Sequence, residues 1–147
     1  MGYNYIDNWF SNFKDIGFDI IDDYNIHYRT VENYYQAAKT LDRDKRIEIS
    51  LLPANKSKRA GKKLELRSNW DIIKIDIMEQ ALRQKFIKGS IWYKKLIDTG
   101  DESIIELNNW RDTFWGYDIN LNRGRNQLGI LLMKLRKEYI NESIINL

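Results

Sequence analysis

Three side chains with complementary chemistry lie close together in the sequence: Glu32, Gln36 and Lys39. On an α-helix they occupy positions i, i+4 and i+7, so an acid, an amide and an amine line one stripe about 10 Å long. A carboxylate and an amine that both reach one ligand can perform acid–base or covalent chemistry. The alternative is a solvated helix face with modest support from i,i+4 pairs. The spacing alone is compatible with both.

The residues around this stripe predict the helix that it needs. Thr30 is a suitable N-cap, because its hydroxyl can accept hydrogen bonds from the free backbone N–H groups of the first turn. Apolar residues then recur every three or four positions, on a face that we expect to be core: Val31, Tyr34, Tyr35, Ala38 and Leu41. A hairpin should precede the helix, with strands at residues 17–21 and 26–28 around a loop of turn-forming residues.

Length and composition favour one small globular domain. With 147 residues and 43% hydrophobic content, the chain can bury one core but is too short for two ordinary domains. We therefore expect a single domain over residues 1–147, ordered from about residue 3 to about residue 140. Its five Trp, nine Tyr and five Phe exceed what such a core needs, so some of them should line a site.

Missing residue types exclude several kinds of site. The chain has no cysteine, which excludes disulfides, thiolate zinc sites and a cysteine nucleophile, and its single histidine, His27, leaves little for a transition-metal site. We expect no metal and no cofactor. No charged leader with an apolar segment opens the chain, and no apolar run reaches about eighteen residues. These patterns favour a cytoplasmic protein without a membrane partner.

The rest of the chain predicts further helices and little β-structure. Helical patterns cover residues 41–52, 54–66, 70–87, 90–98 and 126–139. Ser90 should open the fourth of these helices. The apolar positions expected in the core are Ile47 and Leu51 in the first helix, Ile75, Met78, Leu82 and Phe86 in the third, and Leu128, Leu131, Leu132, Leu135 and Tyr139 in the last. Residues 103–108 alternate as in a half-buried strand, with Ile105 and Leu107 inside. The expected fold is α+β and predominantly helical, with a small N-terminal hairpin.

Two segments suit an anion. Positive residues gather between Lys56 and Arg67, where only Glu65 opposes them, although a solvated basic helix is the alternative. Gly61 lies within this helix at a cost of about 1 kcal/mol, unless its backbone approaches another group closely; a phosphate is one candidate. Asn126 opens the last helix, where free N–H groups and the helix dipole both favour negative charge.

Several of these segments, in this order, resemble the motifs of the NADAR family, also called YbiA-like: Trp9–Phe13, Val31–Lys39, Trp70, Ala81–Phe86, Leu96–Gly100, Asp112–Gly116 and Gly124–Gly129. The resemblance spans nearly the whole chain, with Trp9-Phe10 where the family often has Phe-Leu. It implies one compact, mostly helical α+β domain. Members of this family are N-glycosidases: some hydrolyse phosphorylated riboflavin-pathway intermediates, and others remove ADP-ribose from guanine bases in nucleic acid.

The resemblance implies catalytic roles for two acids and two lysines. N-glycoside cleavage develops charge on the sugar ring, so the carboxylate of Glu32 or Asp112 can stabilise that charge or activate water. Alternatively, Lys39 or Lys85 can form a Schiff base with an opened sugar, provided that burial or a nearby cation lowers its pKa. The charge of Glu32 should raise the pKa of Lys39, whereas Lys85 ends an apolar helix. We therefore expect the lowered pKa at Lys85.

The matching motifs also imply how substrate is held. Trp70 and Trp115 would stack on a base, although both can equally be core residues. Arg59, Gly61, Gly124 and Asn126 would hold phosphate oxygens. The full set of predicted substrate-binding residues is Ser11, Asn12, Gln36, Arg59, Gly61, Trp70, Trp115, Gly116, Gly124 and Asn126.

Three functions compete. The resemblance favours an N-glycoside hydrolase that acts on a phosphorylated ribosyl or ADP-ribosyl substrate, including ADP-ribosylated DNA or RNA. The second function is a non-catalytic module that binds ADP-ribose, NAD or modified nucleic acid. The third, an architectural nucleic-acid protein, rests only on the basic run from Lys56 to Arg67. Only the enzyme needs an ionised carboxylate or a lysine of lowered pKa beside the ribose.

Overall fold

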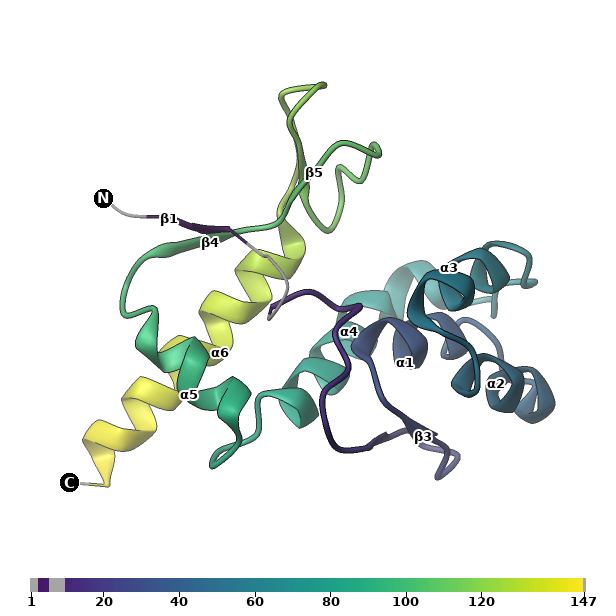
Figure 1. Cartoon of the computed structure of the whole chain (residues 1–147), viewed down its shortest axis with the longest axis horizontal. Coiled ribbons are helices and arrows are strands. Elements are labelled where there is room, and N and C mark those ends of the chain that lie inside the picture. The colour runs from purple at the N-terminus through teal and green to yellow at the C-terminus, as the bar shows by residue number, and fades with distance from the viewer. Residues whose placement is uncertain (1–2, 6–9, 147) are drawn as a thin grey trace. The chain divides into compact units, whose positions relative to one another are not determined.

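The computed structural model describes residues 3–5 and 10–146, and in these residues the fold is α+β and mostly helical, as predicted (Figure 1). The elements are β1 (Tyr3–Tyr5), β2 (Ile20–Ile21), β3 (His27–Tyr28), α1 (Val31–Ala37), α2 (Arg43–Ser50), α3 (Ala54–Lys62), α4 (Trp70–Lys85), α5 (Ile91–Asp98), β4 (Ser103–Ile105), β5 (Leu107–Asn108), β6 (Tyr117–Asp118) and α6 (Gln127–Ile145). They form two compact units. The N-terminal unit is Ser11–Lys85, and the C-terminal unit is Phe86–Leu147 with the chain start up to Phe10. A single-domain organisation stays a prediction.

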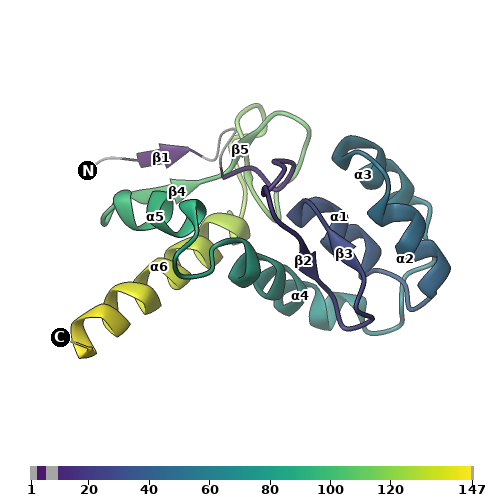
Figure 2. The ribbon, with the colours of Figure 1, turned by 60° about the horizontal axis from the view of Figure 1, so that its bottom comes forward.

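Helix α1 is the centre of the N-terminal unit. It packs against α2, α3 and α4, which lie around it in Figure 2. The predicted cap is confirmed, because Thr30 Oγ1 accepts a hydrogen bond from the Asn33 backbone N–H at 3.0 Å. The predicted core residues of α1 and its C-cap are buried, but Leu41 is exposed, so that part of the prediction was wrong. The helix ends at Ala37, and the chain leaves its buried face before it reaches Leu41.

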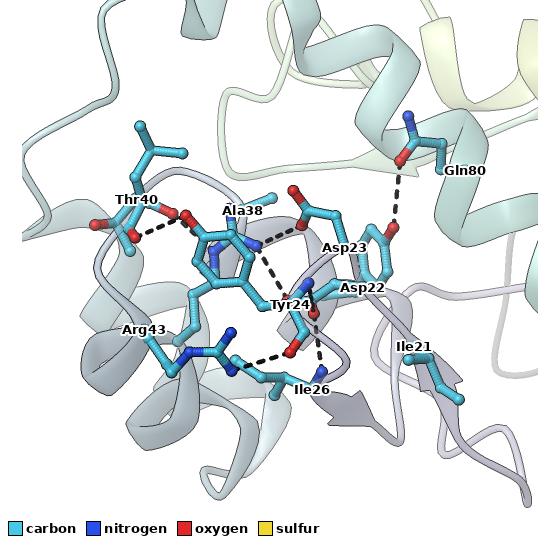
Figure 3. Close-up of polar contacts among 12 residues, drawn as sticks. Ile21, Asp22, Asp23, Tyr24, Ile26, Ala38, Thr40, Arg43 and Gln80 are labelled. Atoms are coloured by element: carbon cyan, nitrogen blue, oxygen red, sulfur yellow. Dashed lines mark hydrogen bonds and ion pairs between the residues drawn. The ribbon is translucent and has the colours of Figure 1, made fainter.

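The predicted hairpin is confirmed as the antiparallel pair β2–β3, with shorter strands than expected. A fully buried guanidinium anchors its loop: Arg46 of α2 lies 2.7 Å from the carboxylate of Asp23 and 3.2 Å from that of Asp22. Arg46 Nε also donates to the Thr40 backbone carbonyl at 2.8 Å. Figure 3 shows these loop and α1-terminal groups together. The network joins α2 and the hairpin loop to the segment that follows the C-terminal end of α1.

Two predicted core faces of this unit were wrong. On α2, Ile47 and Leu51 are exposed, whereas Ile49 is buried beside Arg46. The buried guanidinium therefore takes a position that the apolar pattern could not reveal. On α4, Met78 and Leu82 are buried as predicted, and so is Phe86, which follows the helix. Ile75, which was expected in the core, is 36% exposed. The helices themselves were predicted close to their observed bounds.

The C-terminal unit combines two helices with two parallel strand pairs. The Ser90 hydroxyl caps α5 as predicted, and the interior residues expected in α6 are buried. The predicted strand over residues 103–108 is interrupted at Glu106, so β4 pairs with β1 and β5 pairs with β6. The buried residues of this segment are Ile104 and Asn108, rather than the predicted Ile105 and Leu107. Helix α6 continues to Ile145, beyond the predicted end of the ordered core.

None of the described helices combines the length and apolar character that crossing a membrane requires. Trp9, which belongs to the first predicted motif, lies outside the described residues.

Candidate functional site

The acid and amide of the predicted stripe lie in the interior of the N-terminal unit. Glu32 and Gln36 are only 7% and 5% exposed, because α2, α3 and α4 surround α1. Gln36 Nε2 donates to Glu32 Oε1 at 2.8 Å, so the amide holds the carboxylate in place. Lys39 is half-buried at the end of the stripe. A fully solvated helix face is therefore wrong for this stripe.

The dipeptide Ser11–Asn12 bonds both to helix α1, which bears Glu32, and to the buried amine of Lys85. The carbonyl of Asn12 accepts from the Glu32 backbone N–H at 3.0 Å. The neighbouring carbonyl of Ser11 accepts from Lys85 Nζ at 3.1 Å. Glu32 and Lys85, which are far apart in the sequence, thus both bond the Ser11–Asn12 segment of the predicted motif. The Ser11 hydroxyl accepts from the backbone N–H of Phe13 at 3.1 Å.

Lys85 is fully buried, and this burial decides its acid–base behaviour. Desolvation disfavours the ammonium form, and the positive charge of Lys14 adds to the effect, so the pKa of Lys85 falls to about 7. The direction of this pKa shift agrees with the prediction. At neutral pH a large share of Lys85 is therefore a neutral amine that can act as a nucleophile.

Lys39 behaves differently from the prediction. Burial lowers its pKa and outweighs the charge of Glu32, which raises it. The positive charges of Lys62, Lys58 and Lys74 lower the pKa of Lys39 further. The expectation that Glu32 would raise the pKa of Lys39 above its ordinary value was therefore wrong, because a sequence pattern cannot measure desolvation.

Gly61 makes the close approach that its position in a helix suggested, and the group beside it is Gln36. A Cβ on Gly61 would lie 1.8 Å from Gln36 Oε1, so only glycine leaves room for the amide. Within the described residues, Gln36 Oε1 and Asn12 Oδ1 are buried oxygens that accept no hydrogen bond. Buried polar atoms are normally satisfied, so these two acceptors are suited to donor groups of a ligand or to ordered water.

We expect Gly61→Ala to lower the free energy of unfolding by about 1 kcal/mol, because the added methyl group displaces the Gln36 side chain and breaks its bond to Glu32. Urea unfolding measures the change. In the double variant Gln36→Ala/Gly61→Ala the amide is gone and the methyl group meets only the Cβ of residue 36, at 3.2 Å, so most of the cost of the Gly61 substitution should disappear. A Gly61→Ala protein more stable than wild type, as expected at an open helix position, would contradict this geometry.

The other predicted residues of this unit have simpler surroundings. Trp70 is buried, and its ring lies 5.1 Å from that of Tyr35, which agrees with a core role. Arg59 is exposed on α3. Asn12 is buried, and its amide nitrogen lies 3.6 Å from Met78 Sδ. Sequence reasoning placed Lys58 and Lys62 in the basic run that suits an anion, but did not list them among the site residues, and it missed Lys74. Their positions directly after Ser57 and Gly61 were the signal that separates Lys58 and Lys62 from the rest of the run.

The predicted residues of the C-terminal unit organise their own loop. Asp112 Oδ1 accepts from the backbone N–H groups of Phe114 at 3.1 Å and Trp115 at 2.8 Å. The Asn126 side chain bonds the β4–β5 backbone, donating to the Ile104 carbonyl at 2.8 Å and accepting from the Glu106 N–H at 2.9 Å.

Helix α6 has no side-chain cap, because the Asn126 amide forms its hydrogen bonds with the backbone around β4 and not with the first turn of α6. The two loop glycines lie in contact: a Cβ on Gly124 would be 2.2 Å from the Gly116 carbonyl oxygen. The roles of these loop residues toward a substrate stay predictions.

A comparison with known families decides what this chain is: the NADAR domain model matches residues 3–139. The chain belongs to the NADAR family. N-glycosidase Npun_R5314 of Nostoc punctiforme is 37% identical to this NADAR chain over 138 residues, covering 90% of the chain and 85% of that protein. N-glycosidase YbiA of Escherichia coli is 37% identical over 113 residues, covering 74% and 69%. The predicted family is thus confirmed.

A solved structure agrees with this assignment. The NMR structure of Escherichia coli YbiA matches this NADAR chain with a TM-score of 0.81 and 32% identity, over 98% of the chain and 89% of YbiA. Riboflavin biosynthesis protein VVA0006 of Vibrio vulnificus is 33% identical over 121 residues, which cover 79% of the chain but 32% of that longer protein.

Proposed function

We propose that this NADAR chain is an N-glycoside hydrolase that cleaves the bond between a base or amine and a ribose phosphate or ADP-ribose moiety. The observation that carries the proposal is that one peptide segment bonds the elements that bear both groups. The Asn12 carbonyl accepts from the backbone N–H of Glu32, whose side chain is a buried carboxylate, and the Ser11 carbonyl accepts from Nζ of Lys85, a buried amine of lowered pKa. The relatives named N-glycosidase support the same reaction class.

In direct hydrolysis, Glu32 supplies the negative charge. Cleavage builds positive charge on the sugar ring, and a carboxylate in a water-poor site stabilises that charge or takes a proton from the attacking water. The hydrogen bond from Gln36 holds one carboxylate oxygen, so the group needs little reorganisation during the reaction.

In covalent catalysis, Lys85 attacks the anomeric carbon of the opened sugar. Its neutral amine forms the new C–N bond, the base leaves with its own nitrogen as an amine, and water then hydrolyses the Schiff base to release the sugar and regenerate Lys85. The pKa of about 7 supplies the neutral amine that this route needs.

The proposed substrates are phosphorylated ribosyl compounds. One candidate is a ribosylaminopyrimidine phosphate of the riboflavin pathway, which the riboflavin-named relative supports. The other is ADP-ribosylated guanine in DNA or RNA, which rests on the family resemblance. A cytoplasmic location also stays a prediction.

A chromatographic screen tests the function. The protein is incubated with ribosylaminopyrimidine phosphates and with guanosine-linked ADP-ribose, and released base and sugar phosphate are measured. We expect release from at least one substrate, unchanged by a chelator because no step needs a metal. Binding of ADP-ribose without any release from either substrate would instead favour the non-catalytic module and overturn the enzyme proposal.

A further inference from the structure

Helix α3 brings positive charge to the end of the Glu32–Gln36–Lys39 stripe. It contains four basic residues and no acid. Its buried positions are Ser57 and Gly61, and Gly61 contacts Gln36 of α1. Lys58 and Lys62 each directly follow one of these buried residues, one helical turn apart. They therefore flank the contact between α3 and α1, whereas Arg59 lies one residue further around the helix and is exposed.

Four ammonium groups gather at this place, and we call Lys39, Lys58, Lys62 and Lys74 the lysine cluster. The charges of Lys62, Lys58 and Lys74 all act on Lys39, with Glu32 as the opposing carboxylate. Lys58 Nζ also lies 5.9 Å from the ring centroid of Phe13, close to the Ser11–Asn12 segment. Lys74 pairs with Asp71 at 3.4 Å, but the Asp71 side chain is 89% exposed, so water largely screens that pair.

An anion that enters between these lysines is attracted by several positive charges at once. A phosphate group is the fitting anion, because it carries up to two charges and several acceptor oxygens that separate ammonium groups can share. The cluster is also reachable: Lys62 is exposed, and the other three lysines are half-buried.

We propose that the lysine cluster binds the phosphate or diphosphate group of the substrate, at the end of the stripe away from Glu32. This inference rests on the proposed function, since it places the phosphate end and the anomeric carbon of one substrate at opposite ends of a stripe about 10 Å long. On α3, Lys58 and Lys62 therefore bind the phosphate oxygens, instead of the predicted Arg59.

The first experiment measures anion binding alone, by calorimetry at fixed ionic strength with pyrophosphate and inorganic phosphate as probes. Lys62→Gln removes one exposed charge without touching the core, and we expect about tenfold weaker pyrophosphate binding, with Lys58→Gln acting similarly. Lys45→Gln removes an exposed charge of α2 outside the cluster and serves as the matched control.

The second experiment uses the hydrolysis reaction. With a ribosylaminopyrimidine phosphate, Lys62→Gln should raise KM about tenfold and change kcat less than about twofold. With the dephosphorylated nucleoside it should change neither constant. If the Lys58→Gln/Lys62→Gln protein shows unchanged pyrophosphate binding and unchanged KM, the proposal that the lysine cluster binds phosphate is wrong, while the proposed hydrolase function is unaffected. If pyrophosphate binding depends on the cluster but the protein hydrolyses none of the substrates, the proposed hydrolase function is wrong, while the proposed anion site stands.

Discussion

Glu32→Gln should lower kcat by about a thousandfold while the protein still binds its ligand. Glutamine has nearly the same size, and its side-chain oxygen can still accept the hydrogen bond from Gln36, so the local packing should survive. The negative charge that stabilises the sugar cation, or that activates water, is lost. Base release measured by chromatography gives the rate, and calorimetry with ADP-ribose gives the binding constant.

Two further variants make this result specific. Glu48→Gln removes an exposed carboxylate from α2 and should leave kcat unchanged. Asp112→Asn removes the other candidate carboxylate, whose oxygen organises the loop at Phe114 and Trp115. If Glu32→Gln retains more than about a tenth of wild-type kcat and Asp112→Asn loses activity in a folded protein, the catalytic carboxylate is Asp112.

The local features of both units were predictable, because they depend on neighbours in the sequence. The cap at Thr30 and the buried face of α1 follow from residue type and helical spacing. The cap of α5 at Ser90 and the interior of α6 follow for the same reason. These patterns sufficed for the fold class.

Other features depend on tertiary partners and could not be predicted from periodicity. Ile47 is exposed because Arg46 occupies the protected side of α2 with its two aspartate partners. Gly61 is required by Gln36, which lies on another helix. The pKa of Lys39 is lowered by burial that only the packed structure reveals. In each case a polar or charged side chain is buried or half-buried at a position that an apolar pattern would leave to solvent.

Burial of Lys85 should also leave a signature in the pH dependence of stability. Its folded-state pKa of about 7 lies below the unfolded value near 10.4. Between these two values the unfolded chain binds the extra proton, so the contribution of Lys85 to stability rises with pH from about 7 to about 10. Lys85→Met, of similar length and without a charge, should abolish that rise in urea unfolding measured across this range.

Borohydride added during turnover should trap a sugar adduct on Lys85, identified by peptide mass mapping. The nucleophile is the neutral amine, and its fraction increases as the pH passes the pKa of about 7. The yield of adduct should therefore rise between pH 6 and pH 8, roughly in proportion to the neutral fraction. Lys85→Met should give no adduct and should lower kcat by about a thousandfold if the covalent route carries the reaction.

Lys39 provides the internal comparison, because burial lowers its pKa as well, while the charge of Glu32 opposes the shift. An adduct on Lys39 instead of Lys85 would assign the nucleophile to the stripe itself and would leave the buried amine a positioning role through Ser11. An active enzyme that forms no adduct at either lysine has no Schiff base to trap. Water attack assisted by the Glu32 carboxylate would then be the route, and Lys85→Met would retain most of the wild-type kcat.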